Sequence, residues 1–178
     1  ITKIKQINKI NYKGNLLCWE RLINWDNLII DFDFSKDIQY LKDILIEYPK
    51  SNFLVREVFC HNDLLPSNIL LDKNNNIHII DYEYAGINYL GFEISNHLIY
   101  YNFENRISNL EIIEFLQMFK NDIVSDLDLE IINFFIDLTY FTWMLWGIIS
   151  KNNSNIDFDF NKYINTCKKN IKKLNINF

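Results

Sequence analysis

The sequence predicts a mostly helical α+β domain with one small β-hairpin, and three observations indicate this fold class. Apolar residues recur at helical spacing in the stretch before Pro49. A long apolar stretch at roughly residues 127–150 is typical of a buried helix. Two β-compatible runs, residues 69–71 and 77–80, flank a polar turn. With 178 residues, 49% of them hydrophobic, the chain can form one domain over residues 1–178.

The first third of the chain predicts helices that serve as scaffold. Residues 1–14 end at Gly14, which favours a short helix that closes there. Within residues 15–48, four apolar residues share one helix face and predict an amphipathic helix that stops before Pro49. These four residues are Ile38, Leu41, Leu45 and Tyr48.

In the middle of the chain, the sequence predicts a loop, an apolar element and a hairpin around a polar motif at residues 60–68. Residues 49–52 are polar and read as a loop, and the apolar residues 53–59 form a buried element that leads into the motif. The turn of the following hairpin, residues 72–76, contains Asp, Lys and three Asn, which tolerate turn conformations. The hairpin therefore brings the residues at its two ends, Asn68 and Asp81, close together.

Composition and charge exclude several classes of protein. The formal net charge of −5 argues against a nucleic-acid partner, because phosphate backbones require a concentrated basic face. The four lysines near the C-terminus are interpreted as a solvated helix face. The apolar run at 138–149 is shorter than the roughly 18 residues of a membrane span, which predicts a buried helix and no span. The four lysines near the C-terminus are Lys168, Lys169, Lys172 and Lys173.

Cysteine use and the first residue bear on the origin of the chain. Cys18, Cys60 and Cys167 are odd in number and widely separated, which favours a reduced, cytoplasmic protein over a disulfide framework or a zinc site. The chain starts with Ile and has no signal peptide, which suggests a piece of a longer protein.

Three polar residues around the hairpin have the spacing that phosphoryl transfer needs. Asp63 can accept a hydroxyl proton, and the oxygens of Asn68 and Asp81 suit Mg²⁺, which prefers hard oxygen ligands. His61 and these residues follow the pattern H-x-D-x-x-x-x-N with a later Asp that is typical of protein kinases. His61 itself is interpreted as orienting the backbone, with acid–base work as the alternative.

The tetrad Ile-Asp-aromatic-acid around Asp81 is not specific by itself. It occurs at residues 30–33, 80–83 and 156–159. Only the middle copy, the motif at 80–84, follows the H-N-D-x-x-x-x-N loop through a hairpin. We therefore assign function to the middle copy, with Glu83 in a supporting position.

The motif residues together resemble the choline/ethanolamine kinase family, and its ethanolamine branch in particular. The resemblance is dense and specific at Phe59–Leu65, Ile80–Gly86 and Phe92–His97. It continues more loosely to Trp143–Gly147 and Ile156–Phe160, and is weak over residues 1–52.

The resemblance implies the C-terminal lobe of a protein-kinase-like fold and an ATP- and Mg²⁺-dependent kinase of a small amino alcohol. Ethanolamine would become phosphoethanolamine, the first step of the CDP-ethanolamine route to phosphatidylethanolamine; choline is the alternative substrate. Asp63 would be the base, and Asn68 and Asp81 the metal ligands. The family's aromatic substrate box would fall on Tyr84, Trp143, Trp146, Phe160 and Tyr163.

Residue chemistry supports part of this box. Trp143 and Trp146 share one face of the predicted helix at 127–150, and tryptophan is the best aromatic partner for an ammonium group. Without the resemblance, packing in the core is the simpler explanation of both. A related kinase of sugars or aminoglycosides is a weaker alternative, because sugars need more polar side chains than this region offers.

Two departures from the family pattern affect the prediction. Tyr100 stands where the family usually has an acid, and Glu104 would replace that acid if a helix continued through it. Glu93 replaces the usual Asp and keeps its charge.

The nucleotide-binding half of such a kinase is not recognisable in the sequence. The glycines Gly14, Gly86, Gly91 and Gly147 never cluster, so no glycine-rich phosphate loop is predicted. We therefore expect a C-terminal lobe that turns over poorly alone, or an amine-binding module without catalysis. The sequence does not decide whether the chain forms a homodimer.

Overall fold

The computed structural model describes residues 1–173. In chain order, the helices and strands are α1 (Thr2–Ile7), α2 (Leu17–Asp26), α3 (Ser35–Glu47), the 3₁₀ turn η1 (Phe53–Val55), β1 (Glu57–Cys60), the 3₁₀ turn η2 (Pro66–Asn68), β2 (Ile69–Leu71), β3 (Ile77–Ile79), β4 (Gly86–Tyr89), α4 (Leu90–Ile99), α5 (Asn109–Lys120), α6 (Asp126–Asn153) and α7 (Phe160–Asn170).

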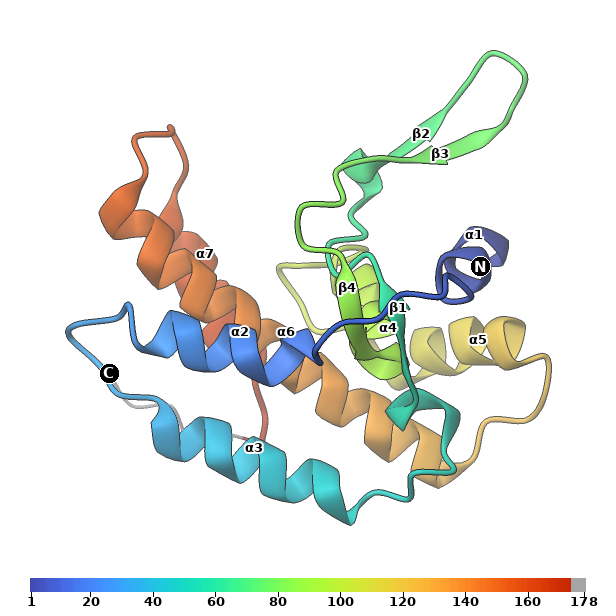
Figure 1. Ribbon diagram of the computed structural model, residues 1–178, viewed down its shortest axis with the longest axis horizontal. Coiled ribbons are helices and arrows are strands. Elements are labelled where there is room, and N and C mark those ends of the chain that lie inside the picture. Colours follow the sequence, from blue (N-terminus) through green and yellow to red (C-terminus); the bar gives the residue numbers. More distant parts are fainter. Residues whose placement is uncertain (174–178) are drawn as a thin grey trace.

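Helix α6 is the centre of the fold, and α2, α4, α5 and α7 pack around it (Figure 1). It begins at a capping box, in which the Ser125 hydroxyl accepts from the Asp128 N–H and the Asp128 carboxylate accepts from the Ser125 N–H. By length and composition α6 could cross a membrane, but most of its apolar window is buried inside the fold. It is thus the core helix that the sequence predicts at about 127–150.

Two pairs of antiparallel strands lie beside the helices. The predicted hairpin is confirmed as β2 and β3, in which Ile69 pairs with Ile79. The sequence does not predict the second pair, β1 with β4, which joins Cys60 to Gly86 across a long connection. In Figure 1 the β2–β3 hairpin projects away from the helices, whereas β1 and β4 lie against α4.

Three expectations about local structure need correction. The first helix ends at Ile7 and not at Gly14, because the Asn8 side chain donates to the Phe59 carbonyl at 2.9 Å and draws the chain toward β1. Residues 53–59 are divided between η1 and β1. Helix α7 ends at Asn170, so Lys172 and Lys173 do not continue a helical face.

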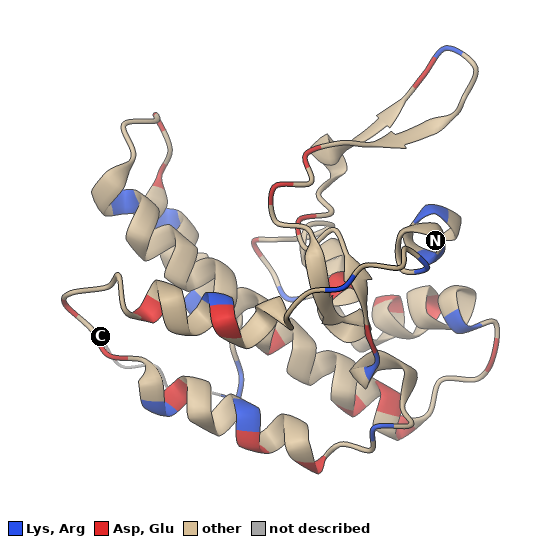
Figure 2. Cartoon of the chain, in the orientation of Figure 1, with Lys and Arg blue, Asp and Glu red and all other residues tan. Residues whose placement is uncertain are grey.

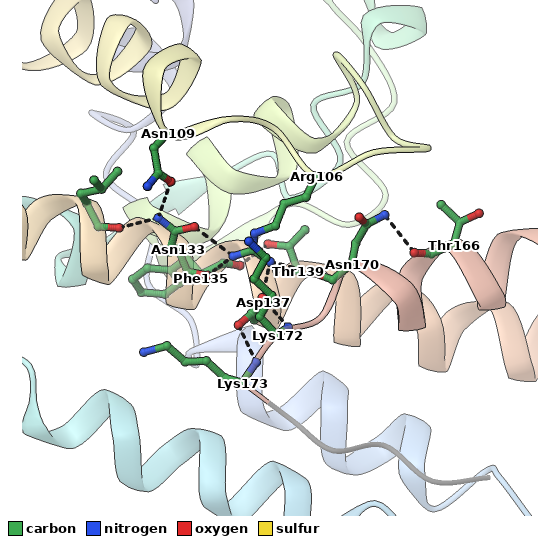
Figure 3. A network of polar contacts seen from close by, with 11 residues as sticks. Arg106, Asn109, Asn133, Phe135, Asp137, Thr139, Thr166, Asn170, Lys172 and Lys173 are labelled. Atoms are coloured by element: carbon green, nitrogen blue, oxygen red, sulfur yellow. Dashed lines mark hydrogen bonds and ion pairs between the residues drawn. The ribbon is translucent and has the colours of Figure 1, made fainter.

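The end of α7 has a physical cause in a buried polar network (Figure 3). The backbone N–H groups of Lys172 and Lys173 donate to the Asp137 carboxylate of α6 at 3.2 and 3.0 Å. Arg106, from the loop before α5, pairs with the same carboxylate and also donates to the Asn170 carbonyl at 2.7 Å. This network ties two distant parts of the chain, the loop before α5 and the segment at the end of α7, to α6.

Acidic and basic residues are both spread along the chain in Figure 2 and alternate along α2 and α3. The amphipathic helix predicted before Pro49 is confirmed as α3, with Ile38, Leu41 and Leu45 buried. Its apolar face packs inward while Lys and Asp residues face outward. The fold is mostly helical and α+β, as predicted.

Candidate functional site

The loop at 61–68 and the motif at 80–84 meet at one end of the β1–β4 pair. The pairing of Cys60 with Gly86 places the residues that follow β1 beside those that precede β4. The Ile80 N–H donates to the Asn68 carbonyl at 3.1 Å, which closes the base of the β2–β3 hairpin. The structure thus brings Asp63, Asn68 and Asp81 to the same end of the hairpin.

His61 is fully buried, and both of its ring nitrogens are engaged. The Asp63 N–H lies 3.3 Å from His61 Nδ1, which acts as the acceptor. Nε2 then carries the hydrogen and donates to the Ile80 carbonyl at 2.8 Å. Burial lowers the pKa of His61, so the ring is kept neutral. This arrangement suits the orienting role that the sequence suggests, since neither nitrogen is free for a substrate.

Helix α4 holds the loop at two residues one turn apart. The Glu93 carboxylate accepts the backbone N–H groups of His61 and Asn62 at 3.0 and 2.9 Å. His97 Nδ1 donates to the Leu64 carbonyl at 3.0 Å, while its Nε2 lies 3.1 Å from the Tyr101 hydroxyl. Because residues i and i+4 share a helix face, one face of α4 fixes the loop on both sides of Asp63.

Asn62 is held in a left-handed conformation with a φ of 64°. Its Nδ2 donates to the Tyr84 carbonyl at 2.9 Å, and its Oδ1 accepts from Asn88 Nδ2 at 2.7 Å. Asparagine tolerates this conformation better than most residues do. The side chain therefore joins the loop at 61–68 to the motif at 80–84 and to β4.

Asp63 is the candidate base and is almost completely buried, with 9% of its surface exposed. Burial and the nearby negative charge of Asp81 raise the pKa of Asp63 to about 6, although a hydrogen bond from Asn68 opposes the shift. Asn68 Nδ2 lies 3.3 Å from Asp63 Oδ2 and 2.9 Å from the Asp63 carbonyl. A carboxylate with a pKa near neutral suits general base catalysis.

The oxygen atoms near Asp63 suit a magnesium ion as ligands. The amide nitrogen of Asn68 is used by Asp63, which leaves its oxygen available as a ligand. Asp81 is exposed with a φ of 64°, and its charge repels that of Asp63, a repulsion that a cation would relieve. Within residues 1–173, no three His, Cys, Asp or Glu side chains form a metal cluster, so other ligands would have to come from phosphate or water.

The five aromatic residues predicted for the substrate box lie in one cluster. Ring centroids are 5.6 Å apart for Tyr84 and Trp143, and 6.0 Å apart for Trp143 and Trp146. Trp146 also lies 6.0 Å from Phe160 and 5.5 Å from Tyr163. Trp143 and Phe160 are buried, and the other three rings are half-buried. The structure thus brings α6, α7 and the motif at 80–84 together, while the role of the cluster remains a prediction.

A glycine allows this contact between α6 and α7. A Cβ atom on Gly147 would come within 2.9 Å of Ile164 and 3.1 Å of Tyr163. Only glycine leaves room for Tyr163 to lie against α6 next to Trp146.

The acid expected from Glu104 does not reach this cluster by a helix. Helix α4 ends at Ile99, with Tyr100 at its C-cap, so the helical turn assumed between Tyr100 and Glu104 is absent. Glu104 is exposed and pairs with Lys162 at 2.7 Å. The Tyr100 hydroxyl instead lies 3.4 Å from that of Tyr163, so two phenols occupy this side of the cluster.

Sequence reasoning missed several residues that shape the site. Asn96 Oδ1 accepts from Trp143 Nε1 at 2.7 Å and sets the orientation of that ring. Trp25 and Arg21 come from α2, outside every motif, and Trp25 lies 6.4 Å from Trp143. Phe158, in the third copy of the tetrad, lies 6.3 Å from Trp146. The spacing of residues gives no signal for these contacts, except that Asn96 and Phe158 lie in stretches that resemble the family.

Comparisons of sequence agree with the resemblance. A family model described as choline/ethanolamine kinase matches residues 3–114. Ethanolamine kinase 2 of Homo sapiens is 31% identical over 187 residues, which cover 90% of this chain and 48% of that protein. Probable choline kinase 2 of Arabidopsis thaliana is 28% identical over 193 residues, which cover 91% of this chain and 55% of that protein. The chain spans about half the length of these relatives.

Comparison of structures confirms the predicted kinase-like fold. The solved structure of an ethanolamine kinase from Plasmodium vivax matches this chain with a TM-score of 0.75 at 20% sequence identity. The match covers 96% of this chain and 57% of that one.

Proposed function

This chain belongs to the choline/ethanolamine kinase family, and we propose that it carries the base, the metal ligands and the amine pocket of an ATP-dependent kinase of ethanolamine. The acceptor is the hydroxyl of the amino alcohol. Its oxygen attacks the γ-phosphorus of ATP, the bond to the bridging oxygen breaks, and ADP leaves. The hydroxyl proton passes to the Asp63 carboxylate.

The protein's own residues prepare this step. Glu93 and His97 hold the loop from both sides, so Asp63 is positioned before the substrate arrives. Asn68 and Asp81 would hold Mg²⁺, which neutralises phosphate charge when bound. The exposed position of Asp81 leaves that side of the site open to the nucleotide.

The observation that carries the proposal is that the loop of the candidate base is joined to the aromatic cluster. Asn62, next to Asp63, donates to the Tyr84 carbonyl at 2.9 Å, and the Tyr84 ring lies 5.6 Å from the Trp143 ring. An ammonium group bound among these rings would place its hydroxyl toward the loop of Asp63, because an amino alcohol separates the two groups by only two carbons. Aromatic faces bind such cations favourably.

Ethanolamine is the proposed substrate, and choline is the alternative. Ethanolamine and choline kinases both occur among the relatives, so the names alone support either amine. The hydroxyl groups of Tyr100 and Tyr163 favour ethanolamine, since a primary ammonium can donate hydrogen bonds to them and a quaternary one cannot.

Replacing the base tests the proposal most directly. In residues 1–178 joined to the nucleotide-binding lobe of human ethanolamine kinase 2, we expect Asp63→Ala to lower kcat about 10²–10⁴-fold. The matched control is Asp72→Ala, at a partly exposed aspartate in the β2–β3 turn, and it should leave kcat unchanged. An Asp63→Ala enzyme with normal turnover would rule out the assigned base.

The chain by itself should be a poor enzyme. No glycine-rich loop is recognisable in its sequence, so ATP should be held weakly. Efficient phosphorylation of ethanolamine by residues 1–178 alone would contradict this part of the proposal.

A further inference from the structure

Arg21 in α2 lies outside the sequence motifs of the site but contacts the aromatic cluster. Its Nη2 donates to the Tyr84 carbonyl at 2.9 Å. Its guanidinium carbon lies 5.1 Å from the centre of the Tyr84 ring and 5.7 Å from that of Trp25. One cation thus sits between two aromatic rings at the edge of the cluster.

The start of α2 is fixed by β4, which explains how Arg21 reaches this place. Leu16 forms a parallel β-bridge with Ile87, and Leu17 packs directly over Gly86. A Cβ atom on Gly86 would lie only 2.3 Å from the Leu17 side chain, so glycine permits the close approach. The first turn of α2 therefore lies beside the residues that precede β4.

The partners of Arg21 are unusual for a largely buried guanidinium. Within residues 1–173 it forms no ion pair with a carboxylate. Burial lowers the pKa of Arg21, and the more distant charge of Asp63 contributes to restoring it. Arg106, by contrast, has a carboxylate partner in Asp137. The ring faces and a carbonyl thus replace the usual carboxylate.

This arrangement has a consequence for the amine. Tyr84 and Trp25 both lie beside Trp143 and so belong to the aromatic cluster. The guanidinium over the Tyr84 ring therefore occupies one ring face of this cluster. A quaternary ammonium has no hydrogen-bond donors and depends on ring faces, whereas a primary ammonium also donates to oxygens such as those of Tyr100 and Tyr163. Loss of one face therefore costs the quaternary group more.

We infer that Arg21 is a specificity-determining residue, which occupies the Tyr84 face of the aromatic cluster and so favours a primary over a quaternary ammonium. The inference rests on the proposed function, since it assumes that the cluster binds the amine. Arg21 acts through Tyr84 and the local charge, and it takes no part in proton transfer.

The test measures the dissociation constants of ethanolamine and choline for residues 1–178 by calorimetry. In Arg21→Gln, the amide can still donate to the Tyr84 carbonyl but the charge is gone. We expect this variant to lower the ratio of the choline to the ethanolamine constant by about five- to tenfold, mainly through tighter choline binding. Arg21→Lys keeps a cation near the ring and should stay close to the wild-type ratio.

Arg56→Gln is the matched control, because Arg56 is exposed at the opposite end of β1 from the catalytic loop. It should leave the ratio unchanged. A ratio in Arg21→Gln equal to that of the wild type would overturn the inference while leaving the proposed function intact. Failure of the wild type to bind either amine would instead contradict the amine pocket itself, and the inference with it.

If Arg21→Gln does not fold, as judged by circular dichroism, Arg21→Met provides a second variant. It removes the guanidinium from the Tyr84 ring but keeps an unbranched apolar stem, so the same ratio should fall in the same direction. An unchanged ratio in Arg21→Met would then overturn the inference.

Discussion

Two buried carboxylates, Glu93 and Asp137, hold two different parts of the chain and differ in how their charge is balanced. Each accepts two backbone N–H groups from a distant segment. Asp137 also pairs with Arg106, whereas Glu93 forms no ion pair within residues 1–173, and burial raises its pKa to about 7. The carboxylate that anchors the C-terminal segment thus has its charge balanced by a cation, whereas the carboxylate that anchors the loop at 61–68 accepts from backbone N–H groups.

The largest expected effect comes from removing the cation of the first anchor. Arg106→Met leaves Asp137 buried without a charged partner, so we expect a loss of about 3–5 kcal/mol in the free energy of unfolding. Urea denaturation measures this loss. In this variant Asp137, like Glu93, would be a buried carboxylate that accepts backbone N–H groups, and it would lack its cation.

The double variant Arg106→Met, Asp137→Leu serves as the control for this prediction. It removes both charges, so much of the lost stability should return. A single variant as stable as the wild type would show that the pair is not needed.

The second prediction concerns the dependence of stability on pH at Glu93. Its pKa is raised from 4.5 to about 7, so the folded state binds the proton more tightly than the unfolded state does. The resulting stability is complete below about pH 4.5 and is lost as the pH rises through about 7, on the order of 3 kcal/mol in total. Glu93→Gln should remove this loss when unfolding is measured from pH 4.5 to 7.5.

Two features of the design isolate Glu93. The raised pKa of Asp63 acts in the same direction over part of this range, so the difference between wild type and variant is the quantity to compare. Glu57→Gln, at an exposed position in β1, should keep the wild-type pH dependence. Parallel curves for the wild type and Glu93→Gln would contradict the assignment.

The smallest effect is expected at Glu104, a carboxylate that is exposed to solvent, unlike Glu93 and Asp137. Glu104 pairs with Lys162 on the surface, where water and salt screen the charges. Glu104→Gln should change neither the melting temperature nor the affinity for ethanolamine measurably. A marked fall in affinity would restore Glu104 as the acid of the amine pocket.

Much of the site was predictable because its signals are local in sequence. The spacing of His61, Asp63 and Asn68 and the hairpin before Asp81 predicted where these residues meet. The aromatic residues of the cluster were predicted from the resemblance. The condition set for Glu104, a helix that continues past Tyr100, is not met, and nothing in the spacing signals that α4 ends at Ile99.

Local signals in the sequence predict the helical core, the hairpin and the arrangement of the loop at 61–68, since these depend on periodicity and turn chemistry between neighbours. Which distant groups meet is set by the tertiary packing instead. Glu93 lies 32 positions from His61, and Arg21 lies 63 positions from Tyr84. Such partners are chosen by the packing of α2 and α4 against β4 and β1, because close approach and burial decide which polar groups must find one another.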